Sequence, residues 1–99
     1  MKYQIIMHIP STRDEDAYFL IDVDGKEFKP DKRLFYYKQG RYYVLSDKKT
    51  GMCITRKLKF AHIVEAWRDT LKQAYEKMVV KDSYEIKARR FKTLQEVSK

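Results

Sequence analysis

Asp22 and Asp24 place two carboxylates close together in the segment FLIDVDGKEF, directly before Gly25. In phosphoryl transfer, one carboxylate of such a pair can attack phosphorus while the other donates or accepts a proton. The same oxygens could instead ligate calcium, which prefers carboxylate and carbonyl ligands. The segment therefore raises the question of whether this chain is an enzyme or a cation-binding protein.

This segment is similar to the nucleophile motif of haloacid-dehalogenase-type phosphatases, D-x-D-G followed by threonine or valine. Here Lys26 follows the glycine, and no helix pattern comes next to hold the loop. The later motifs of that family need a doubly wound domain far longer than 99 residues. A calcium loop fits no better, because the glycine comes two positions too early for D-x-D-x-D-G. Asp24 and Gly25 both tolerate positive φ, so we expect a tight hairpin turn there.

Metal ligands and nucleophiles other than carboxylates are few, namely His8, His62 and Cys53. Neither His-x₃₋₅-His nor Cys-x₂-Cys is present, and structural zinc requires four ligands. A metal held together with aspartate carboxylates stays open. Cys53 with a histidine would be the smallest nucleophilic pair, but it lies inside a strand pattern, where we expect a small buried thiol. The sequence therefore predicts a non-enzymatic protein with no catalytic residues, no metal and no cofactor.

The composition is that of one globular domain spanning residues 1–99, with 43% hydrophobic and 14% aromatic residues. A single cysteine excludes an internal disulfide framework and suits a reducing cytoplasm. The first residues form too short an apolar run for a signal peptide, and no stretch approaches the length of a membrane span. We expect a cytoplasmic protein without a membrane partner, and its oligomeric state stays open.

The net charge of +8 is the strongest compositional signal, and it is concentrated in one part of the chain. Residues 1–31 hold four basic and seven acidic side chains, whereas residues 32–59 hold nine basic and one acidic. Residues 60–82 are balanced, and residues 83–99 are mildly basic. A localised excess attracts polyanions, whereas scattered lysines mainly aid solubility.

Alternation and β-branched residues predict strands at residues 2–9, 17–23, 33–39, 41–47 and 52–58. Apolar residues then recur at three- and four-residue spacing, which predicts a helix over about residues 60–80. The expected apolar stripe of this helix consists of Phe60, Ile63, Val64, Trp67, Leu71, Ala74, Tyr75 and Met78.

The C-terminal segment is ambiguous, because residues 84–91 fit either a strand or the start of a second helix. Thr93 and Glu96 match a capping box, which predicts a short helix beginning at Thr93. The predicted fold class is α+β, with an antiparallel sheet of about four or five strands packed by one long helix in the C-terminal half.

The segment 32–60 interleaves its nine basic side chains with the aromatic residues Phe35, Tyr36, Tyr37, Tyr42 and Tyr43. Aromatic rings for base stacking beside cations for phosphates are typical of single-strand binders. The alternative is a solvated basic face whose cations protect an edge strand. A second cluster lies within residues 87–92. The candidate binding residues are Lys38, Arg41, Tyr43, Lys48, Lys49, Arg56, Lys57, Lys59, Arg89 and Arg90.

Residues 42–67 resemble a hairpin-then-helix unit of small accessory proteins of phages and plasmids. The resemblance rests on Tyr42, Val44, Thr50, Gly51, Ile54, Ala61 and Ala66. The ending FKTLQEV also resembles C-terminal stretches of phage-encoded anti-CRISPR inhibitors of type II CRISPR nucleases. Many anti-CRISPR proteins are acidic DNA mimics. A basic member would instead engage guide RNA, DNA or an acidic face of the nuclease, inside a bacterial host cell.

Two functions follow as expectations. The first is a non-enzymatic binding protein from a phage or mobile element that engages a nucleic-acid-handling complex, such as a Cas9 nuclease with its guide RNA. The second is a small basic regulator that binds free DNA or RNA. A small hydrolase built on Asp22 and Asp24 is the remaining alternative.

Overall fold

The computed structural model describes residues 1–8 and 18–97, and its sheet confirms the α+β prediction. Five antiparallel strands lie in sequence order across the sheet, so each strand pairs with the next along the chain. The strands are β1 (Lys2–His8), β2 (Tyr18–Glu27), β3 (Leu34–Gln39), β4 (Tyr42–Asp47) and β5 (Cys53–Lys57). The predicted end of the first strand, at Ile9, lies outside the described residues.

Gly25 lies inside β2, so the predicted hairpin turn at Asp24-Gly25 is wrong. Residues 18–24 of β2 pair with β1, and residues 25–27 pair with β3. A Cβ atom on Gly25 would lie 2.7 Å from the backbone carbonyl oxygen of Tyr36 and 3.2 Å from the ring of Tyr3. Glycine is needed here for close approach of neighbouring backbone, not for positive φ, which among the described residues occurs only at Gly40 and Gly51.

We expect Gly25→Ala to destabilise the protein by about 1–3 kcal/mol, because the added methyl group has to displace backbone rather than a flexible side chain. For a domain of this size each kcal/mol lowers Tm by about 4–8 °C. Gly40→Asn is the matched control, because Gly40 has open space around it and asparagine tolerates its φ of 60°. Equal melting temperatures for Gly25→Ala and the parent would contradict the close approach.

The predicted helix over residues 60–80 is confirmed as one continuous helical segment with a widened middle. It comprises α1 (Phe60–Ala66), the π-helical η1 (Trp67–Leu71) and α2 (Lys72–Val79). Ile63, Trp67 and Tyr75 are buried, but Val64 and Ala74 of the predicted stripe are exposed. The buried stripe is therefore narrower than the periodicity suggested.

The ambiguous segment 84–91 is helical and belongs to α3 (Asp82–Val97). Thr93 lies well inside this helix, so the predicted helix start at Thr93 is wrong. Asp82 and Glu85 occupy the first turn of α3, where negative charge is favourable at the positive end of the helix dipole. The side chains that α3 buries are Tyr84, Ala88 and Phe91.

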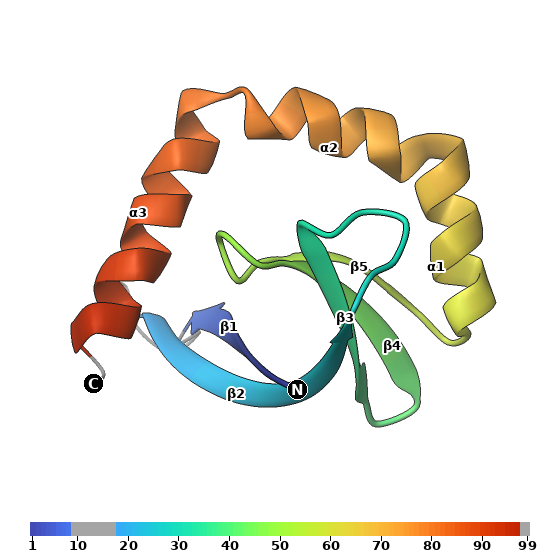
Figure 1. Cartoon of the computed structure of the whole chain (residues 1–99), viewed down its shortest axis with the longest axis horizontal. Coiled ribbons are helices and arrows are strands. Elements are labelled where there is room, and N and C mark those ends of the chain that lie inside the picture. Colours follow the sequence, from blue (N-terminus) through green and yellow to red (C-terminus); the bar gives the residue numbers. More distant parts are fainter. Residues whose placement is uncertain (9–17, 98–99) are drawn as a thin grey trace.

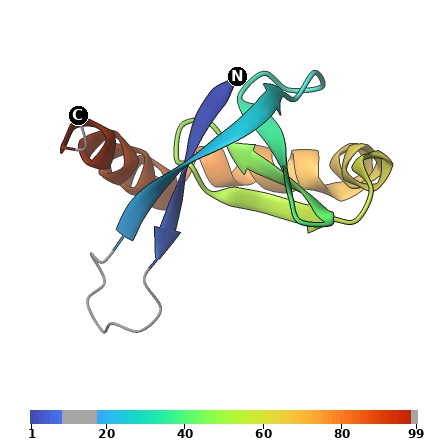
Figure 2. The same cartoon turned by 90° about the horizontal axis from the view of Figure 1, so that it is seen from below.

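The two faces of the sheet are covered by different elements. The helical segment 60–79 packs on one face, where its Trp67 joins Phe28 and Leu45 in one buried cluster. On the other face, Tyr3, Ile5 and Val23 of the β1–β2 pair cover Phe35, Tyr37 and Val44. Figure 1 shows α1, α2 and α3 forming an arc around the sheet. In Figure 2, the β1–β2 pair lies between α3 and strands β3–β5.

Candidate nucleic-acid interface

The predicted binding cations divide into ion-paired and unpaired residues. Lys48 Nζ donates to Glu27 Oε1 at 2.6 Å, and Lys49 Nζ donates to Glu85 Oε1 at 3.0 Å. The hydrogen bond from Lys48 lowers the pKa of the Glu27 carboxyl below its usual range. Both lysines lie at the β4–β5 turn, where local carboxylates already offset part of their charge.

The second group of cations surrounds the β3–β4 turn and the exposed strand β5. Among the described residues, none of these side chains has a carboxylate within 4.0 Å. They are Lys38, Arg41, Arg56, Lys57 and Lys59. Because no neighbouring carboxylate holds them in an ion pair, their charge is available to an external anion.

The strand register places this second group on two faces of the sheet. Lys38, Tyr43 and Lys57 lie opposite one another on β3, β4 and β5, so their side chains share one face. Arg56 lies one residue away, opposite Val44, and its guanidinium sits over the Tyr42 ring at 5.3 Å on the other face. The predicted cations therefore do not form one surface.

On the helix side of the sheet, a groove of about 340 Å³ runs beside Tyr43. We call it the aromatic groove, and its lining includes Lys26, Tyr36, Lys38, Tyr43 and Phe60. One carboxylate, that of Asp24, also lines it and is paired with Lys2. Three strands and the first turn of α1 contribute to it.

The rings in the aromatic groove form a half-buried platform. The Tyr36 and Phe60 ring centroids are 4.4 Å apart, and those of Tyr43 and Phe60 are 6.1 Å apart. Lys38 Nζ lies 5.6 Å from the centre of the Tyr43 ring, and Lys26 is opposite Tyr36 across β2 and β3. A platform of this kind can stack a planar base while the flanking ammonium groups bind phosphate.

Lys26 and Phe60 were missed by the sequence analysis, and their positions explain why. Lys26 belongs to the acidic first third of the chain, and Phe60 was assigned to the helix core. Only the pairing of Lys26 with Tyr36 and the packing of Phe60 on Tyr36 bring them to the site. No local signal in the sequence could have found these neighbours.

The two predicted residues on α3 lie away from the aromatic groove. The Arg90 guanidinium sits over the Tyr18 ring at 4.7 Å. Arg89 lines a separate groove of about 520 Å³ between α3 and the β4–β5 turn, together with Lys49 and Lys92. Arg89 and Lys49 therefore line the same groove, whereas Arg90 contacts the ring of Tyr18.

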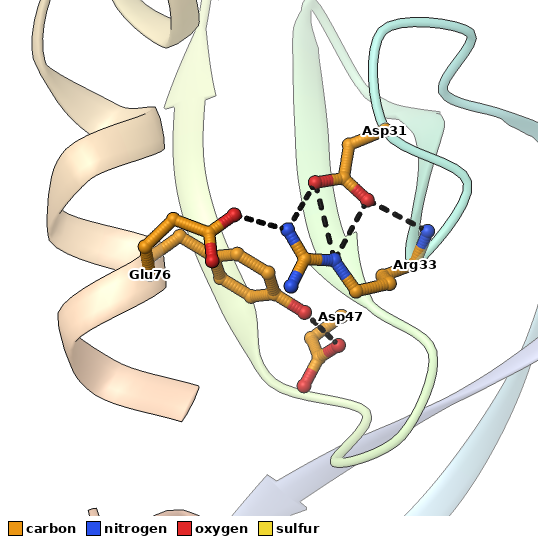
Figure 3. Close-up of polar contacts among 5 residues, drawn as sticks. Asp31, Arg33, Asp47 and Glu76 are labelled. Atoms are coloured by element: carbon orange, nitrogen blue, oxygen red, sulfur yellow. Dashed lines mark hydrogen bonds and ion pairs between the residues drawn. The ribbon is translucent and has the colours of Figure 1, made fainter. Parts of the chain in front are cut away.

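A buried polar cluster ties the helices to the sheet (Figure 3). The Asp47 side chain is fully buried, and it accepts hydrogen bonds from Tyr75 Oη at 2.9 Å and Thr50 Oγ1 at 2.8 Å. Burial and the neighbouring Tyr84 hydroxyl and Asp47 carboxylate raise the pKa of the Tyr75 hydroxyl. Because the Asp47 side chain is shielded from solvent, this cluster holds the fold together and does not present a ligand site.

The partly exposed side of the same cluster is an ion-pair network. Arg33 donates to both carboxylate oxygens of Asp31 and reaches Glu76 on α2 at 2.5 Å. Its guanidinium also covers the Tyr75 ring at 4.7 Å. The Arg33 hydrogen bonds hold the pKa of the Asp31 carboxyl below its usual range. Arg33 thus joins the loop before β3 to the helical segment.

The residues considered for chemistry are dispersed. Asp22 and Asp24 are exposed positions of β2, and His62 is exposed on α1. Cys53 is exposed, so the prediction of a buried thiol is wrong, because β5 is the last strand of the sheet. Within residues 1–8 and 18–97, no three histidine, cysteine or carboxylate side chains gather closely enough to hold a metal ion.

None of the helices in the described part of the chain is long and apolar enough to cross a membrane. The fold and the groove define a small α+β domain with an aromatic and basic sheet face. Comparison of the chain with protein-family models, curated proteins and solved structures found no match.

Proposed function

We propose that this protein is a non-enzymatic binding protein that engages single-stranded nucleic acid, free or within a nucleoprotein, through the aromatic groove. The observation that carries the proposal is the cluster of the Tyr36, Tyr43 and Phe60 rings, flanked by Lys26 and Lys38. Neither lysine has a carboxylate partner within 4.0 Å in the described part of the chain.

The chemistry of the groove favours a nucleic acid strand over an acidic protein segment. Every base offers a π-face to Tyr43 or Tyr36, so stacking needs no particular sequence. Phosphates follow the bases at regular spacing and can pair with Lys38 and, across the β4–β5 register, with Lys57. An acidic peptide would use the cations but would leave the rings without planar partners.

If the protein binds a nucleoprotein rather than free nucleic acid, the sequence resemblance suggests a specific partner. The resemblance of the ending FKTLQEV to C-terminal stretches of anti-CRISPR inhibitors makes a type II CRISPR nuclease with its guide RNA the partner to assay first. A regulator would bind free oligonucleotide by itself, whereas an inhibitor would require the nuclease complex. Pull-down from a bacterial lysate, with and without nuclease treatment, separates these two forms.

Tyr43→Leu is expected to weaken binding of a fluorescent dT12 oligonucleotide by about tenfold or more, because stacking on one aromatic ring contributes about 1–3 kcal/mol per base. Leucine keeps an apolar side chain against Phe60, so folding should be retained. Fluorescence anisotropy at low salt measures the affinity, and thermal denaturation confirms the fold.

Phe19→Leu is the matched control, because Phe19 is an exposed aromatic residue on β2 that lies outside the aromatic groove. It should bind like the parent. Polyglutamate serves as a competitor that offers charge without bases. If polyglutamate competes as well as dT12, or if Tyr43→Leu binds normally, the groove does not stack bases and the proposed function is wrong.

A further inference from the structure

A second basic concavity lies between α3 and the sheet. Two adjacent hollows of about 420 and 520 Å³ share Lys48 and Gln95 in their linings, and we call them together the helix groove. Its lining contains five cations and two carboxylates, Asp22 and Glu85. The five cations are Lys2, Lys48, Lys49, Arg89 and Lys92. Three of these cations are ion-paired, namely Lys2 with Asp24, Lys48 with Glu27 and Lys49 with Glu85. Arg89 and Lys92 have no carboxylate within 4.0 Å in the described part of the chain, and their positive charge suits a phosphate chain rather than a neutral ligand.

Contacts at the floor of the helix groove fix α3 against the sheet. The Gln95 side-chain amide donates to Gln4 Oε1 at 2.8 Å, which fixes the end of α3 on β1. A Cβ atom on Gly51 would lie 2.5 Å from the ring of Phe91, so α3 also lies directly against the β4–β5 turn. The cations therefore project from a packed junction of helix and sheet.

The helix groove adjoins the aromatic groove. Lys2 lines the first, Asp24 lines the second, and their side chains meet at 3.3 Å. Lys48 directly follows β4 and lies five residues beyond Tyr43, which corresponds to about 17 Å of extended chain at about 3.4 Å per residue. A stacked strand that rises about 3.4 Å per nucleotide would span that separation with about five nucleotides.

We infer that the helix groove is a second nucleic-acid site, and that one single strand occupies both grooves by passing the Lys2–Asp24 pair. This inference rests on the proposed function and extends it to the length and path of the ligand. Phosphates replace Glu27 and Glu85 as partners of Lys48 and Lys49, because exposed ion pairs of this kind contribute little to stability. A strand too short to span both grooves gains nothing from the second.

The experiment compares dT4 and dT12 in the parent and in Arg89→Gln/Lys92→Gln by fluorescence anisotropy at low salt. A dT12 strand offers about nine positions to a four-nucleotide site, which raises the apparent affinity about ninefold over dT4. Linked binding at two sites raises the affinity by a further factor of about 10² or more. We expect the parent to bind dT12 several hundredfold more tightly than dT4. The double variant should lose most of that gain, and it should still bind dT4 at the aromatic groove, which neither Arg89 nor Lys92 lines.

Lys77→Gln/Lys81→Gln removes the same charge from exposed positions that line neither groove, and it should keep the full gain. A parent gain of only about tenfold, or an undiminished gain in Arg89→Gln/Lys92→Gln, overturns the second site and leaves the aromatic groove standing. If the parent binds neither oligonucleotide, the proposed function and this inference both fail.

Discussion

Trp67→Ala is expected to destabilise the protein by about 3–5 kcal/mol, the range for removing a large buried aromatic side chain. Trp67 is only 4% exposed and starts the π-helical turn η1. Its ring meets Phe28 edge-on at 5.7 Å between centroids and Tyr75 at 5.8 Å. Since small domains have total stabilities of about 5–15 kcal/mol, this single change would remove a large share.

Chemical denaturation followed by circular dichroism would measure this loss of stability. Val64→Ala on the same helical segment is the control, because Val64 is 36% exposed and its truncation should cost far less. If purified Trp67→Ala unfolds at the same denaturant concentration as the parent, then the helical segment 60–79 is not packed on Phe28 as described.

A large loss of binding is expected from neutralising the unpaired cations around the β3–β4 turn and β5. We predict that a variant with four of them changed to glutamine binds dT12 at least about 100-fold more weakly at low salt. Each lost phosphate contact should reduce the slope of log affinity against log salt by about 0.7. The four changes are Lys38→Gln, Arg41→Gln, Arg56→Gln and Lys57→Gln.

This four-residue variant should melt close to the parent, because exposed charges contribute only about 0–1 kcal/mol each to stability. The matched control removes four exposed lysines elsewhere, namely Lys29, Lys32, Lys77 and Lys81. A salt titration of dT12 affinity compares the two variants. Should both variants lose affinity equally, net charge rather than these particular cations drives binding, and the unpaired cations are only solvated.

Local patterns determined the secondary structure that could be predicted. Alternation of side chains between two faces is a property of each strand alone, so strands β3 and β4 were predicted to within one residue of their observed ends. The same holds for the helical segment from Phe60 to Val79, whose apolar spacing follows the period of a helix. The charge excess of residues 32–59 is also local and needs no tertiary information.

The secondary-structure predictions were wrong where one local sequence pattern is compatible with two different structures. Asp24-Gly25 fits a turn, but the glycine serves the close approach of Tyr36, which only strand pairing reveals. Tyr84 and Ile86 are spaced as in a strand, yet both belong to α3, where Tyr84 is buried and Ile86 is 56% exposed. Residues 84–91 are helical because a helix buries Tyr84, Ala88 and Phe91 together, and this tertiary packing outweighs a short alternating pattern.

The sequence by itself determined an α+β chain with its positive charge and aromatic rings in one segment. Only the tertiary structure decided which of those residues are neighbours. Register set Lys38 and Lys57 on the face of Tyr43 and turned Arg56 to the opposite face. Lys48 and Lys49 form ion pairs with Glu27 and Glu85, which are distant from them in the sequence. Such pairings depend on how strands and helices pack across long sequence separations, which no local pattern of residues specifies.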